Sequence, residues 1–176
     1  MTFSLANVNG RAALVSGENY YDLATLSGGA LGSDPMAALQ TLKALSKELS
    51  EAKPTGLVAD VELGAPVPRP GSCFAIGLNY RGHAIEADMA IPETPMIFTK
   101  YPSCIVGPTA AVEMRSDYTD YEAELVAVIG KGGKNISVDD GWDHVAGLCV
   151  GQDISDRPAQ FNAMPPQFNM GKSFDT

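Results

Sequence analysis

The chain has 176 residues, of which 45% are hydrophobic and 19% charged, the composition of an ordinary globular protein. Its 21 acidic residues outnumber the 12 basic ones, and the net charge is −9 with no basic cluster, which argues against nucleic acid or an anionic membrane as a partner. We expect no signal peptide, because the first residues lack a basic stretch followed by an apolar core, and no apolar run approaches membrane-spanning length. We therefore expect a soluble cytoplasmic protein.

The first third of the chain, residues 1–66, is predicted to form a small N-terminal α+β domain. Asn9-Gly10 lies between two strand-like segments and is the strongest short-range signal for a β-hairpin. Residues 19–26, NYYDLATL, predict one further short strand. The domain is therefore expected to begin as a small sheet.

An amphipathic helix is predicted over residues 32–53. Either Ser33 or Asp34 is its expected N-cap, and Pro35 falls in its first turn. Apolar side chains recur at helical spacing and predict one buried stripe, which contains Met36, Leu39, Leu42, Leu45 and Leu49.

A second domain is predicted over residues 67–176, after a crossing at residues 64–72 that is rich in proline and glycine. It contains strand-like segments separated by turns: CFAIGLNY, PMIFTKY, CIVG, YEAELVAVIG and VAGLCVGQDIS. Residues 137–147 predict a short helical turn. Many short strands and few helices predict an α+β fold that is mainly β, arranged as a sandwich or barrel.

Three carboxylates lie beside strands that are predicted to be buried. Glu122 and Glu124 are two residues apart, so in a strand their side chains point to the same face. Two like charges are costly to bury together, and therefore either the strand begins in water or a cation lies between them. Asp153 follows another apolar run. With no cysteine or histidine pair nearby, these oxygen ligands favour Mg²⁺ or Mn²⁺.

Four further side chains could carry chemistry. His83 and Glu86 are one helical turn apart, so the carboxylate could orient the imidazole for proton transfer, although many surface turns share this pattern. Arg157 and Gln160 follow Asp153 closely and could hold a substrate carboxylate.

Lys172 lies in the stretch MGKSF, among small and apolar residues. It is either an ordinary surface lysine or a buried one that faces an anionic ligand. The local sequence favours the surface lysine and leaves the buried one open.

Taken together, five segments resemble the fumarylacetoacetate hydrolase family, and they occur in the family's order: GLNYRGHAIE, PMIFTKYPSCIVGP, DYEAELVAVIGK, VAGLCVGQDISDR and GKSF. The resemblance covers residues 70–176 and implies the β-sandwich roll of this family. The first third is similar to the small N-terminal domain that many bacterial members carry. Members continue well past the lysine of GKSF, so we expect residues 67–176 to be the N-terminal portion of the catalytic domain, and the isolated chain to be inactive.

The resemblance also implies roles for individual residues. It implies a divalent metal, Mg²⁺ or Mn²⁺, held by Glu122, Glu124 and Asp153. It implies catalytic roles for His83, Glu86 and Lys172. It implies substrate contacts from Arg157, Gln160 and Lys100, the last in the FTK strand. Members are commonly homodimers.

The implied reaction is metal-dependent hydrolysis of a C–C bond in a 2,4-dioxo acid, of the acylpyruvate or diketo-deoxy sugar acid type, through a metal-chelated enolate. The same scaffold is compatible with a decarboxylase, isomerase or dehydratase of a 2-oxo acid, because the enolate forms in each case. An inactive or truncated copy that only binds is the third alternative.

Overall fold

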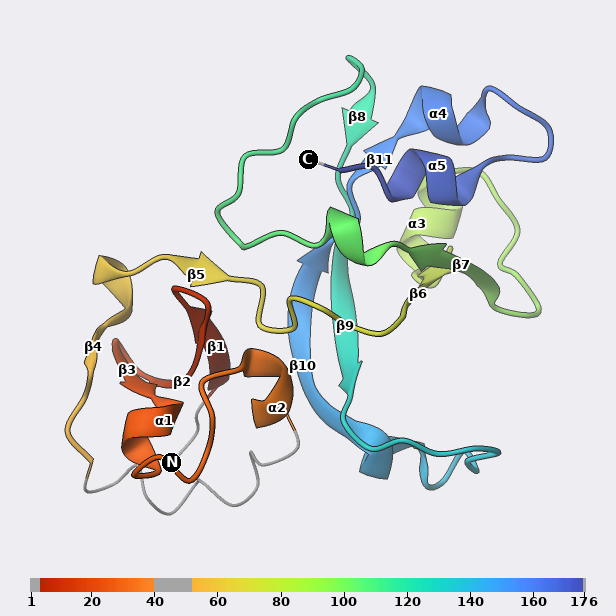
Figure 1. The fold of residues 1–176 in the computed structure, drawn as a ribbon. Coiled ribbons are helices and arrows are strands. Elements are labelled where there is room, and N and C mark those ends of the chain that lie inside the picture. The colour runs from red at the N-terminus through yellow and green to blue at the C-terminus, as the bar shows by residue number, and fades with distance from the viewer. Residues whose placement is uncertain (1–3, 40–51, 176) are drawn as a thin grey trace. The chain divides into compact units, whose positions relative to one another are not determined.

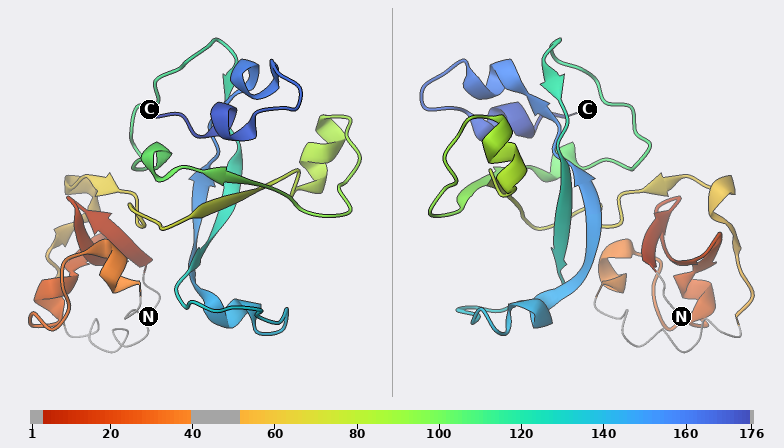
Figure 2. Two further views of the ribbon diagram at one scale, coloured as in Figure 1. Left: turned by 45° about the vertical axis from the view of Figure 1, so that its right-hand side comes forward. Right: turned by 180° about the vertical axis from the view of Figure 1, so that it is seen from behind.

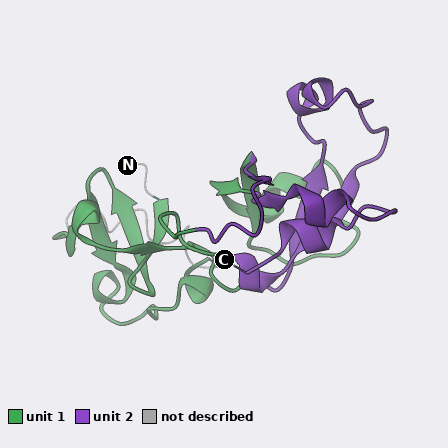
Figure 3. Ribbon diagram, turned by 90° about the horizontal axis from the view of Figure 1, so that it is seen from above, with its two compact units in different colours: residues 1–69, 106–111, 123–152 green, residues 70–105, 112–122, 153–176 purple. Residues whose placement is uncertain are grey.

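The computed structural model describes residues 4–39 and 52–175 (Figure 1). The chain divides into two compact units, each assembled from segments that are distant in the sequence (Figure 3). The first unit contains residues 1–69, 106–111 and 123–152, and the second contains residues 70–105, 112–122 and 153–176. The division into domains 1–66 and 67–176 stays a prediction.

The first unit contains an antiparallel sheet with the strand order β4-β3-β2-β1-β5. Its strands are β1 (Ser4–Val8), β2 (Arg11–Ser16), β3 (Asn19–Asp22), β4 (Gly56–Leu57) and β5 (Leu63–Gly64). The predicted hairpin is confirmed, because Val8 pairs with Arg11 across a two-residue turn. Asn9 and Gly10 have φ of 50° and 80°, the positive values that a type I′ turn requires.

The strand predicted over residues 19–26 is wrong in its second half. β3 ends at Asp22 and a short helix follows, α1 (Leu23–Leu26). The Asp22 side chain accepts a hydrogen bond from Thr25 N at 2.9 Å and caps this helix. The cap therefore overrides the strand propensity of the residues that follow it.

The predicted amphipathic helix is confirmed where it begins. α2 (Pro35–Ala38) has Asp34 as its N-cap, and the Asp34 carboxylate accepts from Met36 N at 3.0 Å. Residues 40–51 of the prediction, with Leu42, Leu45 and Leu49, lie outside the described residues. The predicted end of the helix is wrong, because residues 52–53 are described and are irregular.

A small apolar core lies between this sheet and its helices. The fully or nearly buried members are Ala12, Leu14, Leu23 and Ala38, and the half-buried side chains packed on them are Leu5, Tyr21, Leu26 and Leu31. A 3₁₀ turn over Val58–Asp60 separates β4 from β5.

The first unit also contains a two-stranded antiparallel ribbon, visible in both views of Figure 2, made of β9 (Ala123–Ile129) and β10 (Val145–Gln152). The predicted helical turn before β10 is confirmed as a 3₁₀ turn over Gly141–His144. The prediction that these strands are buried is wrong, because Leu125 is 59% and Val150 80% exposed. A sheet of two strands has too little surface to bury both of its own faces.

The second unit contains two short antiparallel pairs and three helices. β6 (Cys73–Gly77) pairs with β7 (Met96–Lys100), and β8 (Thr119–Asp120) pairs with β11 (Ser155–Asp156). The helices are α3 (Arg81–Glu86), α4 (Arg157–Phe161) and α5 (Phe168–Lys172).

The segment CIVG, predicted as a strand, is instead the end of a 3₁₀ turn over Pro102–Cys104 and the irregular chain after it. Pro102 has no N–H for a strand ladder and favours the first position of such a turn. The fold as a whole is α+β and mainly β, as predicted. None of the helices within residues 4–39 and 52–175 is long and apolar enough to span a bilayer.

Replacing Asp22 by asparagine is expected to lower the free energy of unfolding by about 2 kcal/mol at neutral pH. Hydrogen bonds from Arg11, at 2.8 and 3.1 Å, and from Thr25 lower the pKa of the Asp22 carboxyl to about 2. A lowered pKa stabilises the folded protein above the unfolded-state pKa of about 4, and this contribution is lost as the pH falls through about 2. Thermal unfolding between pH 7 and pH 2 measures both effects.

The matched control is Asp34→Asn, which changes an N-cap whose side chain is 50% exposed and is expected to cost less. An Asp22→Asn variant with the stability and acid dependence of the unchanged protein would contradict this account.

Candidate active site

Two of the predicted metal ligands are brought together by backbone pairing. Asp153 N donates to Glu122 O at 2.9 Å, just beyond the end of the β9–β10 ladder. The β8–β11 ladder then continues with Ser155 opposite Asp120. Glu122 and Asp153 are therefore held side by side although they are far apart in the sequence. We call these two residues the carboxylate pair.

Lys172 places its ammonium group between these two carboxylates. Its Nζ donates to Glu122 Oε2 at 2.9 Å, to Asp153 Oδ2 at 3.2 Å and to Ser155 Oγ at 2.6 Å. Three acceptors satisfy the three ammonium protons, and the side chain is only 4% exposed. Of the two alternatives left by the sequence, the buried lysine is the one observed.

The position of Lys172 depends on close packing between α4 and α5. A Cβ built on Gly171 would lie 2.6 Å from Gln160 Cβ, so only glycine allows this approach. Gln160, which is 2% exposed, also accepts a hydrogen bond from Gln167 N through its backbone oxygen at 2.7 Å. The helix that carries Lys172 is thereby fixed against α4.

Arg157, at the start of α4, binds the other side of Glu122. Its Nη2 donates to Glu122 Oε1 at 2.7 Å and to Asp120 Oδ2 at 2.6 Å, and its Nη1 donates to Gln160 Oε1 at 3.1 Å. Arg157 and Gln160 are therefore neighbours, as a joint role in binding requires.

Lys100, the last residue of β7, binds the other side of Asp153. Its Nζ donates to Asp153 Oδ1 at 2.5 Å and to the backbone oxygen of Lys172. Each of the four oxygens of the carboxylate pair thus faces one cationic nitrogen. We call the six interacting side chains the charged cluster: Lys100, Asp120, Glu122, Asp153, Arg157 and Lys172.

These contacts lower the pKa values of Glu122 and Asp120. Burial raises the pKa of the Glu122 carboxyl, but hydrogen bonds from Lys172 and Arg157 outweigh it and hold this pKa below its usual value. The hydrogen bond from Arg157 likewise lowers the pKa of Asp120. In Arg157, burial lowers the pKa while the bonds to the same two carboxylates raise it, and the net change is upward.

Asp120 and Ser155 were not predicted from the sequence as site residues. Each of them lies two residues from a predicted ligand, Asp120 before Glu122 and Ser155 after Asp153. Because side chains two apart in a strand share a face, this spacing was the available signal.

His83 and Glu86 lie on α3, where His83 is half-buried and Glu86 is exposed. Within the described part of the chain, no hydrogen bond or ion pair joins them to each other or to the charged cluster. Their catalytic pairing stays a prediction.

Glu124 lies in β9, opposite Gly151. In the chain segments that the structure describes, no three histidine, cysteine or acidic side chains gather in an arrangement that could hold a metal ion. The carboxylate pair nevertheless already shares one cation, the Lys172 ammonium. Its oxygen donors therefore fit Mg²⁺ or Mn²⁺ in their chemistry.

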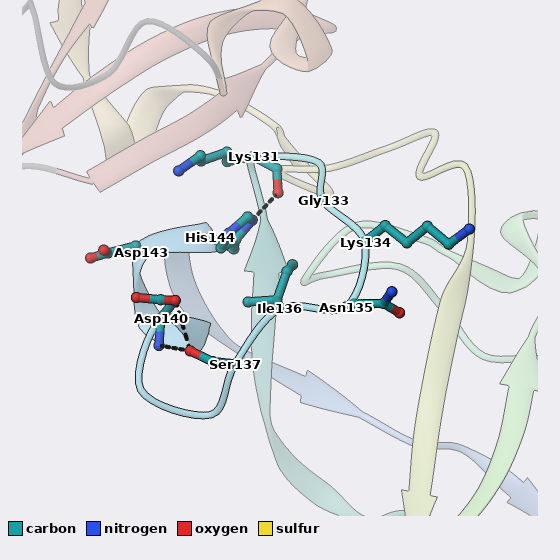
Figure 4. Close-up of a pocket in the computed structure, with 9 residues that line it drawn as sticks. All are labelled: Lys131, Gly133, Lys134, Asn135, Ile136, Ser137, Asp140, Asp143 and His144. Carbon is teal, nitrogen blue, oxygen red and sulfur yellow. Dashed lines mark hydrogen bonds between the residues drawn. The ribbon is translucent and has the colours of Figure 1, made fainter.

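A cavity of about 370 Å³ is formed by the segment that connects β9 to β10 (Figure 4). Its lining is Lys131, Gly133, Lys134, Asn135, Ile136, Ser137, Asp140, Asp143 and His144, and it includes none of the predicted site residues. The buried His144 donates from Nδ1 to Lys131 O at 2.8 Å. This hydrogen bond gives His144 a structural role in the chain before β10.

Comparison with known proteins gives consistent matches. Residues 72–176 match the family described as "Fumarylacetoacetate (FAA) hydrolase C-terminal". A fumarylacetoacetate hydrolase domain-containing protein 2 homolog of Dictyostelium discoideum is 45% identical over 121 residues, which are 68% of this chain and 39% of that protein. Oxaloacetate tautomerase YisK of Bacillus subtilis is 44% identical over 125 residues, 68% of this chain and 41% of that protein. The mitochondrial oxaloacetate tautomerase fahd2 of Xenopus laevis is 42% identical over 120 residues, 67% of this chain and 38% of that protein.

Solved structures share the fold. A Mycobacterium smegmatis protein assigned as HpcE has a TM-score of 0.85 at 41% identity, over 97% of this chain and 62% of that chain. Maleylpyruvate hydrolase of Sphingobium sp. SYK-6, crystallised with manganese(II) and pyruvate, has a TM-score of 0.74 at 25% identity, over 98% of this chain and 62% of that chain. The chain thus spans 38–41% of the length of these curated relatives. It belongs to the fumarylacetoacetate hydrolase family.

Proposed function

We propose that the protein containing this chain is a metal-dependent enzyme that interconverts the keto and enol forms of a small 2-oxo acid such as oxaloacetate. The observation that supports this most directly is the buried ammonium of Lys172 between Glu122 and Asp153, with Arg157 beside it. Carboxylate oxygens suit a hard dication, and the basic side chains suit the carboxylates of the acid.

The proposed metal ligands are Glu122, Glu124 and Asp153, and the proposed ion is Mg²⁺ or Mn²⁺. Two carboxylates that face one cation support this choice for Glu122 and Asp153. A divalent ion, when bound, would supply Lewis-acid polarisation of the 2-oxo group.

The remaining roles follow from charge and hydrogen-bonding capacity. Arg157 offers a planar guanidinium that can hold a substrate carboxylate, with Gln160 orienting it and Lys100 adding a second positive charge. Lys172 would stabilise negative charge that develops on the substrate oxygen. His83 with Glu86 would move the proton between carbon and solvent.

The tautomerase proposal is favoured by the relatives of 42–44% identity that carry this name. Hydrolysis of a C–C bond in a 2,4-dioxo acid, of the acylpyruvate or diketo-deoxy sugar acid type, is the second candidate. It is favoured by the likeness to maleylpyruvate hydrolase. The two reactions share the enolate, and only hydrolysis requires that His83 with Glu86 activate a water molecule.

A homodimer and a cytoplasmic location stay predictions. The relatives include both a bacterial protein and one named mitochondrial, so similarity does not select a compartment.

Product analysis distinguishes the two reactions. With Mg²⁺ or Mn²⁺ added, the protein expressed from its complete reading frame is expected to accelerate the loss of enol absorbance from fresh oxaloacetate. It is expected to release little pyruvate from an acylpyruvate, measured with a coupled dehydrogenase. Rapid pyruvate release would favour the hydrolase. No effect on either acid would contradict both reactions and favour a protein that only binds its ligand.

Replacing Lys172 by methionine is expected to lower kcat/KM by about a hundredfold or more, because a preorganised cation next to the reacting oxygen is lost. The control is Lys134→Met, which removes the same charge from an exposed site and is expected to change nothing. Because the change also leaves the buried Asp153 and the half-buried Glu122 without their shared ammonium, folding is checked by circular dichroism. Lys172→Arg, which keeps the charge, is the second variant. Full activity in a folded Lys172→Met protein would contradict the assigned role.

A further inference from the structure

Lys100 is held in a fixed position at the end of β7. Cys73 is its partner in the β6–β7 ladder. Ser173 Oγ donates to Thr99 O at 3.1 Å and accepts from Tyr101 N at 3.2 Å, so one hydroxyl ties both neighbours of Lys100 to the end of α5. The ammonium group therefore reaches Asp153 from an anchored backbone, and its side chain is 15% exposed.

The two lysines that share Asp153 depend on it differently. Lys172 also has Glu122 Oε2 and Ser155 Oγ as acceptors, at 2.9 and 2.6 Å. For Lys100, Asp153 Oδ1 is the one carboxylate oxygen within ion-pair distance among the described residues, at 2.5 Å. Among the described residues, the largely buried Lys100 ammonium therefore depends on Asp153 Oδ1 alone for an ion pair.

A metal ion bound by Asp153 would compete with that ammonium. A divalent cation binds a carboxylate oxygen at about 2.0–2.6 Å, so it and Lys100 cannot both lie against the same oxygen without strong like-charge repulsion. Binding therefore requires that Lys100 move away or that its ion pair with Asp153 weaken.

We propose that Lys100 is an internal counter-ion that lowers the affinity of the carboxylate pair for divalent metal. This rests on the proposed metal site at Glu122 and Asp153. Lys100 neutralises Asp153 in the metal-free protein, and its displaced ammonium becomes the positive charge that meets the carboxylate of an incoming oxo acid. Lys100 acts as a positioning residue for Asp153 until a metal ion replaces its ammonium group there.

The test measures Mn²⁺ binding alone, without substrate, by titration calorimetry and by the electron paramagnetic resonance signal of free Mn²⁺. Lys100→Met is expected to bind Mn²⁺ at least about fivefold more tightly than the unchanged protein, the lower end of coupling between linked sites. Lys100→Arg, which keeps the charge, and Lys134→Met, which removes an exposed one, are expected to bind as the unchanged protein does.

A merely structural role for Lys100 would weaken Mn²⁺ binding on substitution, so the direction of the change decides. If Lys100→Met does not fold, Lys100→Gln retains a polar group beside Asp153 and takes its place. Unchanged or weaker binding in the folded variant overturns the inference and leaves the proposed metal site standing. Binding by the variant alone supports the inference, whereas binding by neither protein overturns it together with the metal-dependent function.

Discussion

The ammonium group of Lys172 is the contact on which the arrangement of the second unit depends. Glu122 and Asp153 are joined by a backbone hydrogen bond, which brings together the buried Asp153 carboxylate and the half-buried Glu122 carboxylate. Without a cation their repulsion and desolvation would oppose the strand pairing on either side of them. Lys172 removes this penalty, and it reaches the two carboxylates only because Gly171 lets α5 lie directly against Gln160.

The charged cluster is balanced as it stands. Its three basic and three acidic side chains, Lys100, Arg157 and Lys172 with Asp120, Glu122 and Asp153, form a connected set of ion pairs. A dication added to a balanced set brings two uncompensated charges, which an anionic oxo acid would offset. Because the acid offsets the charge of the metal ion, the binding of each is expected to favour the binding of the other.

Local chemistry was sufficient to predict part of this structure. Asn9-Gly10 requires positive φ at both residues and so predicted the hairpin, and Asp34 before a proline predicted the start of α2. The strand–helix change at Asp22 was missed because the decisive interaction is a cap, not a propensity. The acid pattern at Glu122 left open a strand start in water or a cation between the acids, and favoured Mg²⁺ or Mn²⁺, whereas the cation that contacts Glu122 and Asp153 here is the Lys172 ammonium.

The partners themselves could not be predicted from the sequence pattern alone. Lys172 is 50 residues from Glu122, and Lys100 is 53 residues from Asp153. No periodicity connects such positions, and a lone lysine has the same local pattern whether it is buried or exposed. Only the resemblance to a family selected Lys100 and Lys172 as site residues, and the structure supplied the ion pairs that join them to the acids.

The scaffold alone does not decide the reaction, because proton transfer and C–C cleavage both pass through an enolate of a 2-oxo acid. They differ in whether a base must also deliver water. The candidate base, His83, lies on α3 and makes no hydrogen bond or ion pair with the charged cluster within the described segments. Both reactions need cations to stabilise an enolate, and in both the proposed role of His83 with Glu86 is to move a proton. Hydrolysis additionally requires that the same pair activate a water molecule. The charged cluster is therefore compatible with either reaction, and the proposal of tautomerisation rests on the relatives that carry this name.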